Sequence, residues 1–275
     1  MGMSHTVTSV APTAADAWTA VGVVTVPAGA KSLVGVKINY AVDPGTTAVV
    51  VHSVPVIRLI GSGLLEQSPH QYIGPGVDAA SIAATAGYNV TQPHTRIYDV
   101  SIEVSVGGTI DVQCNSLDEI VAGQVTVEMD FSPDAPKGGN SMSDYVDAPI
   151  PGSVDAWVTV GSLTVPQAKA GAEPKKIKRV TCEFVPDVAA TAVSERSSTR
   201  FRMTGAGLGE GGLHEFLGPC LGGYSVVTGP GVYDHCIVDH DTNIPVNPGG
   251  TILVETIHDT ELADGGTSVF GVQYE

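Results

Sequence analysis

The stretch DAWTAVGVVTVP at residues 16–27 recurs as DAWVTVGSLTVP at residues 155–166. The two stretches are 139 residues apart, and 8 of their 12 aligned positions are identical. Repetition of this strength indicates that one structural unit occurs twice in the chain. Because the matching positions include the Trp and Pro residues, chance similarity between two unrelated β domains does not explain them.

A second block repeats at a shift of 144 residues, and it pairs Arg58, Gly61, Gly63, Leu64, Glu66, His70, Gly74 and Pro75 with Arg202, Gly205, Gly207, Leu208, Glu210, His214, Gly218 and Pro219. The difference, 144 − 139 = 5, places a net five-residue insertion in the second copy, which we expect in the polar stretch 167–175. A weaker match pairs residues 107–110 with 249–252. The chain is therefore a tandem duplication of a unit of roughly 130 residues.

Three regions follow from this duplication. Residues 1–132 are predicted to form a first sandwich and residues 154–275 a second one. The segment between them, 133–153, is rich in Pro and Gly, which is typical of a loop or linker.

The dominant hydrophobic period within each copy is two, which is the period of a strand with one buried and one solvent-exposed face. The clearest runs of alternating residues are 34–40, 100–106, 110–114 and 125–131 in the first copy, with 180–184 and 270–274 in the second. About seven or eight such strands per copy favour a β-sandwich, either jelly-roll or immunoglobulin-like. The Cys-Trp-Cys spacing of immunoglobulin domains is absent, so we predict an all-β chain of two tandem, homologous, antiparallel β-sandwiches of jelly-roll type.

Composition narrows the function classes. The 275 residues carry 13 Lys and Arg against 29 Asp and Glu, a formal net charge of −16. Phosphate backbones need a basic surface, so direct nucleic-acid binding is not expected. No apolar run approaches the ~20 residues of a membrane-spanning helix, and the N-terminus lacks a signal-peptide pattern, so we expect neither membrane insertion nor secretion.

The paired residues of the two blocks are the first candidates for a site. Trp18 and Trp157 each precede a strand and are predicted to plug one end of a sandwich core, the alternative being a platform for stacking sugars. Three further pairs are predicted to hold a long loop against its sandwich: Arg58 and Arg202, Glu66 and Glu210, and His70 and His214. A general acid/base role for the Glu–His pairs is the alternative.

Cysteine and metal-ligand patterns are weak. Cys114, Cys182, Cys220 and Cys236 occupy no matched positions in the repeats, so they are interpreted as mostly buried thiols. The densest group of metal-capable residues is Asp234, His235, Cys236, Asp239, His240 and Asp241, but on a strand these alternate between two faces. Calcium at Asp118 with Glu119, or Asp259 with Glu261, is the other alternative to a solvated acidic surface. We predict no catalytic residues, no metal and no cofactor.

Charge is unevenly placed in the second half. Its eight basic residues all lie between Lys169 and Arg202, whereas residues 203–275 hold ten Asp or Glu and no Lys or Arg. The simple interpretation is an uneven surface. The alternative is head-to-tail complementarity, in which the basic region of one subunit meets the acidic region of another, as in rings and shells.

With its paired blocks around Trp18 and Trp157, and at 58–75 and 202–219, the chain resembles the double jelly-roll capsid proteins of icosahedral viruses. In that family each subunit carries two sandwiches, and three subunits form a pseudo-hexagonal capsomer. The resemblance implies a structural virion protein that assembles with copies of itself, as a homotrimer or larger assembly, and with other shell proteins. It also implies location in the virion after assembly in the host cytoplasm.

Several other functions remain open. A capsid decoration or cement protein, or another self-assembling shell or filament protein, would carry the same tandem sandwiches. A tandem carbohydrate-binding module should expose a row of aromatic residues, yet aromatic residues make up only 5% of the chain. A cupin-like enzyme would need a convergent set of His and carboxylate ligands, which the sequence does not present.

Overall fold

The computed structural model describes residues 3–10, 17–42, 49–53, 55–65, 69–75, 77–81, 94–116, 123–136, 143–149, 156–167, 175–186, 193–209, 211–225, 236–258 and 266–275. Within these ranges the regular structure consists of strands. They contain no helix long and apolar enough to cross a membrane.

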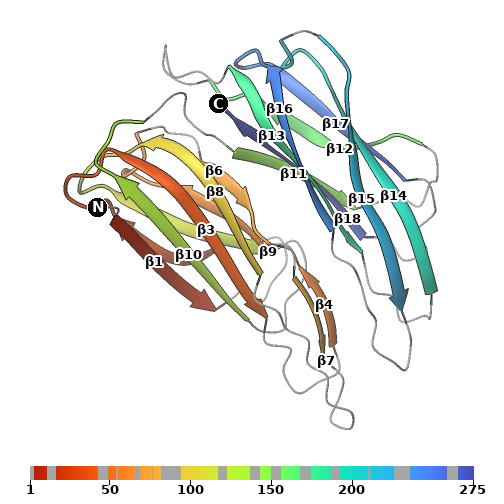
Figure 1. Cartoon of the computed structure of the whole chain (residues 1–275), viewed down its shortest axis with the longest axis horizontal. Coiled ribbons are helices and arrows are strands. Elements are labelled where there is room, and N and C mark those ends of the chain that lie inside the picture. The colour runs from red at the N-terminus through yellow and green to blue at the C-terminus, as the bar shows by residue number, and fades with distance from the viewer. Residues whose placement is uncertain are drawn as a thin grey trace.

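Among the described residues, ten strands belong to the first copy: β1 (Met3–Val10), β2 (Thr19–Thr25), β3 (Ser32–Val42), β4 (Val49–Ser53), β5 (Pro55–Ile60), β6 (His70–Ile73), β7 (Val77–Ser81), β8 (His94–Glu103), β9 (Thr109–Ser116) and β10 (Gly123–Ser132). Eight follow in the second: β11 (Ser143–Pro149), β12 (Val158–Thr164), β13 (Lys176–Pro186), β14 (Val193–Thr204), β15 (His214–Ser225), β16 (Cys236–Pro245), β17 (Thr251–His258) and β18 (Gly266–Tyr274). The two sets form two sandwiches that lie side by side (Figure 1).

Strand order identifies each sandwich as a jelly roll. The first pairs the sheets β1-β10-β3-β8 and β2-β9-β5-β6, and the second pairs β11-β18-β13-β16 and β12-β17-β14-β15. The two arrangements are the same once the short β4-β7 pair is set aside, and every pairing is antiparallel. Two packed four-stranded sheets with this winding are the jelly-roll architecture. The predicted fold class and the resemblance to double jelly-roll proteins at the level of fold are therefore confirmed.

The extra pair in the first jelly roll is a local variation on the second. At the shift of 144 residues, β4 and β5 together align with β14, and β6 and β7 together align with β15. Pro55 begins β5 and has no N–H to donate to a ladder, and Gly74 donates its N–H to the Pro55 carbonyl. The long strands of the second copy are thus divided in the first, and their outer parts form the β4-β7 ribbon seen below the first sandwich in Figure 1.

Each jelly roll has its own core, filled by inward side chains of both sheets. In the first, Val125, Val127, Met129 and Phe131 are at most 1% exposed, as the period of two predicts. In the second, the core is centred on Phe201, Phe270 and Tyr274. Two separate cores mean that each copy buries its own apolar face, as expected for a duplicated domain.

One predicted strand departs from simple alternation. Val34 was expected on the buried face with Val36, yet it is 39% exposed while Leu33 is fully buried. The register of β3 against β8 and β10 shifts at this point, which marks a β-bulge. An extra residue reverses the inward and outward order of everything before it, so Leu33 takes the buried place.

A repeated glycine of the second block has a steric reason. Gly61 and Gly205 adopt φ values of 128° and 125°, where side chains are strained. A Cβ at either position would lie 2.4 Å from a carbonyl oxygen, that of Thr109 or Thr251. Both copies therefore retain glycine because backbone approaches backbone at the same place.

The predicted linker was too long. Residues 133–153 include β11, which pairs with β18 along its whole length and belongs to the second jelly roll. The same shift of 139 residues that relates the Trp blocks also aligns Met142, Ser143 and Val146 with Met3, Ser4 and Val7. The two valines make equivalent contacts, because Val7 packs on Gly22 and Val146 packs on Gly161. The composition around β11 is polar and Pro-rich, so the sequence analysis assigned this first strand of the second jelly roll to the linker.

The bulge makes a direct test possible. Leu33→Ala should lower the free energy of unfolding by about 2–5 kcal/mol, because it leaves a cavity in the first core. Val34→Ala, its neighbour and matched control, should change it by less than about 0.5 kcal/mol. Urea unfolding followed by tryptophan fluorescence measures both, and equal effects would contradict the bulge.

Candidate functional site

The repeated Trp and Arg residues form the same stack in each jelly roll. The Arg58 guanidinium lies 4.1 Å from the ring centroid of Trp18, and that of Arg202 lies 4.3 Å from the ring of Trp157. Both distances are within cation–π range. The identity of these residues in the two copies thus reflects a shared surface contact.

A third residue completes each stack from the neighbouring strand. Arg58 donates to the Gln113 side chain, opposite it on β9, and Arg202 donates through Nε to Glu255 on β17 at 2.7 Å. These hydrogen bonds join neighbouring strands of one sheet in each copy. Residues 66–68 lie outside the described residues, so the role of the arginines in holding a long loop stays a prediction.

The predicted placement of Trp18 and Trp157 also needs correction. Both side chains are only half-buried, and neither belongs to the core cluster of its sandwich. Trp18 instead packs against a small separate cluster of Val56, Ile73 and Val269. Its indole therefore lies outside the sandwich, under an arginine.

The predicted histidine sites differ between the copies. His70, on β6, is fully buried, whereas His214 at the start of β15 is half-buried. Glu66 and Glu210 lie outside the described residues, so the Glu–His alternative stays a prediction. The matching sequence positions do not give matching environments.

The acidic and histidine cluster of β16 divides between two faces, as the strand period predicts. Asp239 and Asp241 face arginines of β8 and β13, whereas His240 bonds the Leu217 carbonyl on β15. Asp234 and His235, the calcium candidates Asp118, Glu119, Asp259 and Glu261, and the Cys236 side chain lie outside what is described. Over the described ranges, no group of three His, Cys, Asp or Glu side chains could hold a metal ion.

The two cysteines whose side chains are described are buried thiols. Cys114 and Cys182 lie in the two cores and form no disulfide. Burial raises the pKa of Cys114 to about 12 and that of Cys182 well above its ordinary value. These thiols are unreactive core residues, as predicted, while the side chains of Cys220 and Cys236 are outside the described set.

Part of the uneven charge of the second half is paired within the second jelly roll. Three basic residues of the segment 169–202 pair with acids from the C-terminal region: Lys176 with Glu275 at 3.4 Å, Arg179 with Asp241 at 3.1 Å and Arg202 with Glu255 at 2.7 Å. Arg179 faces Asp241 across β13 and β16 of one sheet, and Arg202 faces Glu255 across β14 and β17 of the other. These residues are distant in sequence but are paired in space.

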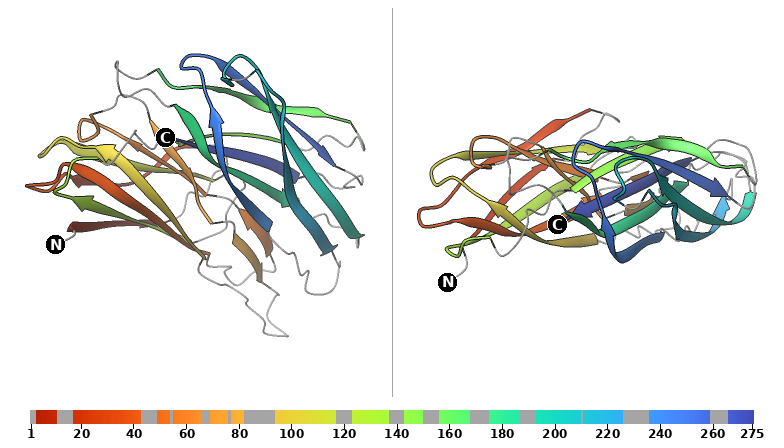
Figure 2. Two further views of the ribbon diagram at one scale, coloured as in Figure 1. Left: turned by 45° about the horizontal axis from the view of Figure 1, so that its top comes forward. Right: turned by 90° about the horizontal axis from the view of Figure 1, so that it is seen from above.

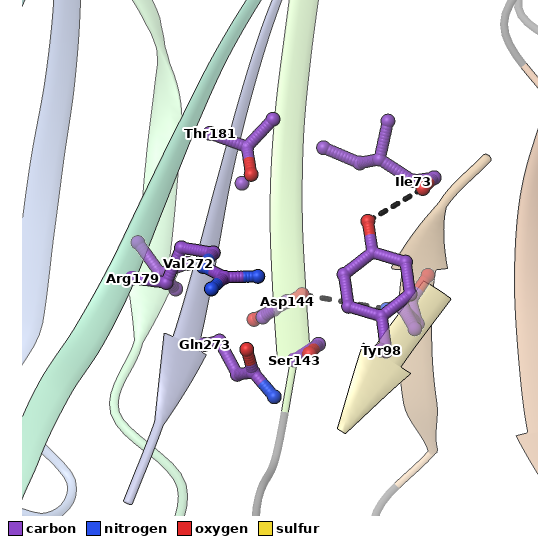
Figure 3. A pocket seen from close by; sticks show the side chains of 10 residues that line it. Ile73, Tyr98, Ser143, Asp144, Arg179, Thr181, Val272 and Gln273 are labelled. Carbon is purple, nitrogen blue, oxygen red and sulfur yellow. Dashed lines mark hydrogen bonds between the residues drawn. The ribbon is translucent and has the colours of Figure 1, made fainter. Parts of the chain in front are cut away.

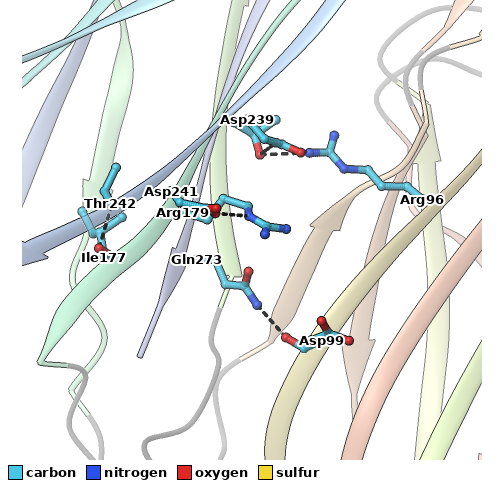
Figure 4. Close-up of polar contacts among 9 residues, drawn as sticks. Arg96, Asp99, Ile177, Arg179, Asp239, Asp241, Thr242 and Gln273 are labelled. Carbon is cyan, nitrogen blue, oxygen red and sulfur yellow. Dashed lines mark hydrogen bonds and ion pairs between the residues drawn. The ribbon is translucent and has the colours of Figure 1, made fainter.

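The most unusual polar chemistry lies in the joint between the two jelly rolls. There, β6 and β8 of the first meet the outer face of the β11-β18-β13-β16 sheet of the second (Figure 4). Val56, Ile73 and Val269 form its apolar part, and all three are at most 3% exposed. Ile73 packs onto Gly271 so closely that a Cβ there would lie 2.5 Å from its Cδ1. A fit this tight fixes the two sandwiches relative to each other.

Arg96 supplies the ionic part of the joint. Its guanidinium crosses from β8 to Asp239 at 2.6 Å and to the Thr181 hydroxyl at 3.0 Å, and Thr181 also donates to Asp239 at 2.6 Å. Burial lowers the pKa of Arg96, but Tyr98, Asp239 and the fully buried Glu183 raise it, so the net pKa lies above the ordinary value. Arg96 therefore stays charged in a largely dehydrated position.

Two further groups surround a small pocket in the joint (Figure 3). Tyr98 donates its hydroxyl to the Ile73 carbonyl at 2.5 Å, and burial raises its pKa to about 12. Asp144, on β11, accepts from the Tyr145 N–H at 2.9 Å and faces the Gln71 amide at 3.4 Å. Burial raises the pKa of Asp144 to about 6, although the bond from Tyr145 lowers it. The pocket is narrow and mixed in character, with Gln71 and Asp144 beside Ile73, which suits a structural joint better than a site for an organic ligand.

Of these joint residues, the sequence analysis singled out only Asp239, as one of a group of metal-capable residues and not as the partner of Arg96. One signal was available, because Arg96 occupies an inward position in the alternation of Tyr98, Val100 and Ile102, where an apolar residue is the rule. A charged residue in such a place indicates a buried partner. The partner itself, Asp239, is 143 residues away and could not be identified without the fold.

Comparison with known proteins gives similarity of fold only. No protein-family model matches the chain, and no curated protein matches it significantly. Among solved structures, the STIV major capsid protein matches with 10% identity over 100% of this chain and 96% of its own, at a TM-score of 0.49. A peptide-N(4)-(N-acetyl-β-D-glucosaminyl)asparagine amidase matches with 12% identity over 99% and 96%, at 0.30, and a T=1 Penaeus vannamei nodavirus structure with 9% over 89% and 82%, at 0.21. At these identities no residue's role can be carried from those proteins to this one.

The ionic part of the joint can be tested by removing its cation. Arg96→Met should lower the free energy of unfolding by about 3–5 kcal/mol, because the buried Glu183 carboxylate loses its neighbouring positive charge. Arg179→Met is the matched control, since its pair with Asp241 is exposed, and it should cost less than about 1 kcal/mol. Adding Glu183→Gln to Arg96→Met should recover part of the loss in chemical denaturation. Equal effects of the two arginine changes would contradict a buried network.

Asp144 predicts a specific pH dependence. Its pKa is about 6 in the folded chain against an ordinary 3.8, so the folded state binds this proton more tightly. Its destabilising contribution is therefore full above that folded pKa and disappears as the pH falls through the interval to the unfolded pKa. Asp144→Asn keeps the acceptor oxygen, and it should be more stable than the parent by up to about 3 kcal/mol near neutral pH.

Denaturation midpoints of the two proteins across this interval measure the effect. The difference between them should vanish in acid. Asp241→Asn, at an exposed carboxylate, should show a difference from the parent below about 1 kcal/mol throughout. A pH-independent gap for Asp144→Asn would refute the assignment.

Proposed function

We propose that this chain is a structural virion protein that self-assembles into a capsid shell, as a major capsid protein with two jelly rolls. The observation that carries the proposal is that two jelly rolls of the same strand order are joined by a tight, buried contact. A shell is built by repeating one geometry many times, so its unit must hold its parts in fixed orientation. The joint of Ile73 with Gly271 and Arg96 with Asp239 supplies such rigidity.

The surface supports partners that are proteins rather than nucleic acid. Most cations whose contacts are described lie against a carboxylate or an aromatic ring, including Lys37, Arg58, Arg96, Lys176, Arg179 and Arg202. With a net charge of −16, little free positive charge remains for phosphate. We infer that the partners are copies of this chain, as a homotrimer or larger assembly, and other shell proteins. Location in the virion after assembly in the host cytoplasm, and a non-enzymatic role, belong to the same proposal.

A decoration or cement protein, or another shell or filament protein, is the second form of this proposal, because it would use the same rigid block. The carbohydrate-binding alternative is less well supported. Its best platforms were Trp18 and Trp157, and an arginine lies over each ring at 4.1 Å and 4.3 Å. A sugar would have to displace these guanidinium groups before it could stack.

The proposal is tested by measuring mass and shape together. The purified chain, examined by light scattering after size exclusion and by electron microscopy of the same fraction, should form trimers or larger rings, tubes or closed shells at micromolar concentration. Closed shells or flat lattices would favour a major capsid protein over a decoration protein. A stable monomer of 28.2 kDa that binds glycans on an array would refute assembly and support the binding module.

A further inference from the structure

Asp144 is a carboxylate at the joint that forms no ion pair with the described residues. Both of its described hydrogen bonds reach one oxygen, Oδ1, from the Tyr145 N–H at 2.9 Å and from Gln71 Nε2 of the first jelly roll at 3.4 Å. Both donors are uncharged. An ionised carboxylate in this place loses hydration without gaining an opposite charge.

The charged groups around Asp144 are already matched with other partners. β6 presents the uncharged Gln71, because His70 and Tyr72 lie on its other face. The remaining titratable or charged neighbours are Arg96, Tyr98 and Asp99 on β8, Lys178, Arg179 and Glu183 on β13, Asp239 and Asp241 on β16, Tyr274 on β18, and Tyr145 and Asp147 on β11 itself.

Each of the three cations in this group lies beside another carboxylate. Arg96 pairs with Asp239 at 2.6 Å, and Arg179 pairs with Asp241 at 3.1 Å. The charge of Lys178 interacts with Glu275 and Asp99. Asp144 therefore has no cation of its own among the described residues.

The second oxygen of Asp144, Oδ2, accepts no hydrogen bond from the described residues. A proton placed there removes the charge while Oδ1 keeps both of its bonds. The wall of the same pocket also contains Ser143 Oγ, which is buried and has no hydrogen-bond partner in the described part of the chain (Figure 3). This pocket therefore suits a protonated Asp144 better than an ionised one.

The pKa of Asp144 agrees with this geometry. Burial raises it from an ordinary 3.8 to about 6, although the bond from Tyr145 lowers it. The phenols nearby stay protonated, because burial raises the pKa of Tyr98 to about 12 and that of Tyr274 well above its ordinary value. Asp144 thus changes its charge in weak acid while these neighbours keep theirs.

Loosening of the joint would leave both sandwich cores closed. The joint buries a separate small cluster of Val56, Ile73 and Val269, whereas the core of each jelly roll lies between its own two sheets. Gln71 and Asp144 are 73 residues apart in sequence and belong to different jelly rolls. A charge at their contact therefore acts on how the two jelly rolls are held together.

We propose that Asp144 is a proton switch in the joint, where proton uptake at Oδ2 tightens the contact between the two jelly rolls and proton release loosens it. Neither sandwich unfolds in this change. A shell needs the tight form, so weak acid favours assembly, and this last step rests on the function proposed above.

The direction and size of the effect follow from linkage. In the tight joint the pKa of Asp144 is about 6, above the ordinary 3.8 expected when the joint is open. The contact is therefore weakest above about pH 6, where Asp144 is ionised in both states, and it strengthens as the pH falls towards the lower pKa. A difference of about two pH units changes the opening equilibrium by up to about a hundredfold.

The two tryptophans of the chain make the switch measurable. Trp18 packs against the small cluster of the joint, whereas Trp157 lies on the second jelly roll, so Trp157→Phe and Trp18→Phe leave one reporter each. Between about pH 7.5 and about pH 5, the urea midpoint from Trp18 fluorescence should rise, and that from Trp157 should change less. Adding Asp144→Asn should raise the Trp18 midpoint near neutral pH and remove most of this pH dependence.

Asp134→Asn is the matched control, because it removes the same charge from an exposed side chain of the first jelly roll. It should keep the parent's pH dependence at Trp18. Equal responses of Trp18 and Trp157 would place the effect of Asp144 within the second sandwich and overturn the switch, as would a Trp18 midpoint that does not change with pH. A response that disappears when choline replaces sodium would assign the pocket to a metal ion and not to a proton.

The assembly step is measured separately. The parent should assemble at a concentration at least about tenfold lower at about pH 5 than at about pH 7.5, whereas Asp144→Asn should need the lower concentration at both. The same pH dependence in both proteins would refute the link between the switch and assembly. A chain that assembles at neither pH refutes the proposed function, and the Trp18 measurement still decides the switch.

Discussion

The contact of Ile73 with Gly271, closed by the Arg96–Asp239 ion pair, turns two duplicated domains into one body. Each sandwich has a core of its own, and a smaller buried cluster is shared between them. What the contact supplies is orientation. The absence of a side chain on Gly271 lets the isoleucine approach the sheet, and a buried cation with defined acceptors permits few alternative placements.

Duplication explains much of the remaining structure. The strand order, the register of the ladders, the glycine turns at Gly61 and Gly205 and the Trp–Arg stacks are the same in both copies. Side chains differ both on the outer faces, where Gly271 corresponds to Glu128, and in the cores, where Val127 corresponds to Phe270. The duplicated backbone has therefore been kept while many of its side chains have diverged.

The Trp–Arg stacks are a case in which the sequence repeat was recognised but the contacts of its Trp residues were predicted incorrectly. Identical Trp and Arg residues in both copies indicated a shared geometry. However, a Trp in the core and a Trp stacked under an arginine on the sheet surface would give the same repeated residues in the sequence. Cross-strand pairing decides between them, because Gln113 and Glu255 become neighbours of the arginines only when β9 and β17 are placed. The first strand of the second jelly roll was missed for a related reason, since its Pro-rich and acidic surroundings outweighed a short match to Met3–Val10.

Sequence alone determined the duplication, the all-β class and the inward residues of most strands, because the period of two and the repeated blocks are local properties of the chain. It did not determine that Val34 faces outward, because a bulge depends on the partner strands. Nor could it place Arg96 beside Asp239 or bury Asp144, because such pairs are brought together from distant segments by packing, and burial changes a side chain's chemistry only after the neighbours have assembled. The local sequence pattern therefore predicts the two sandwiches, whereas the contacts in the joint between them are determined only by the tertiary structure.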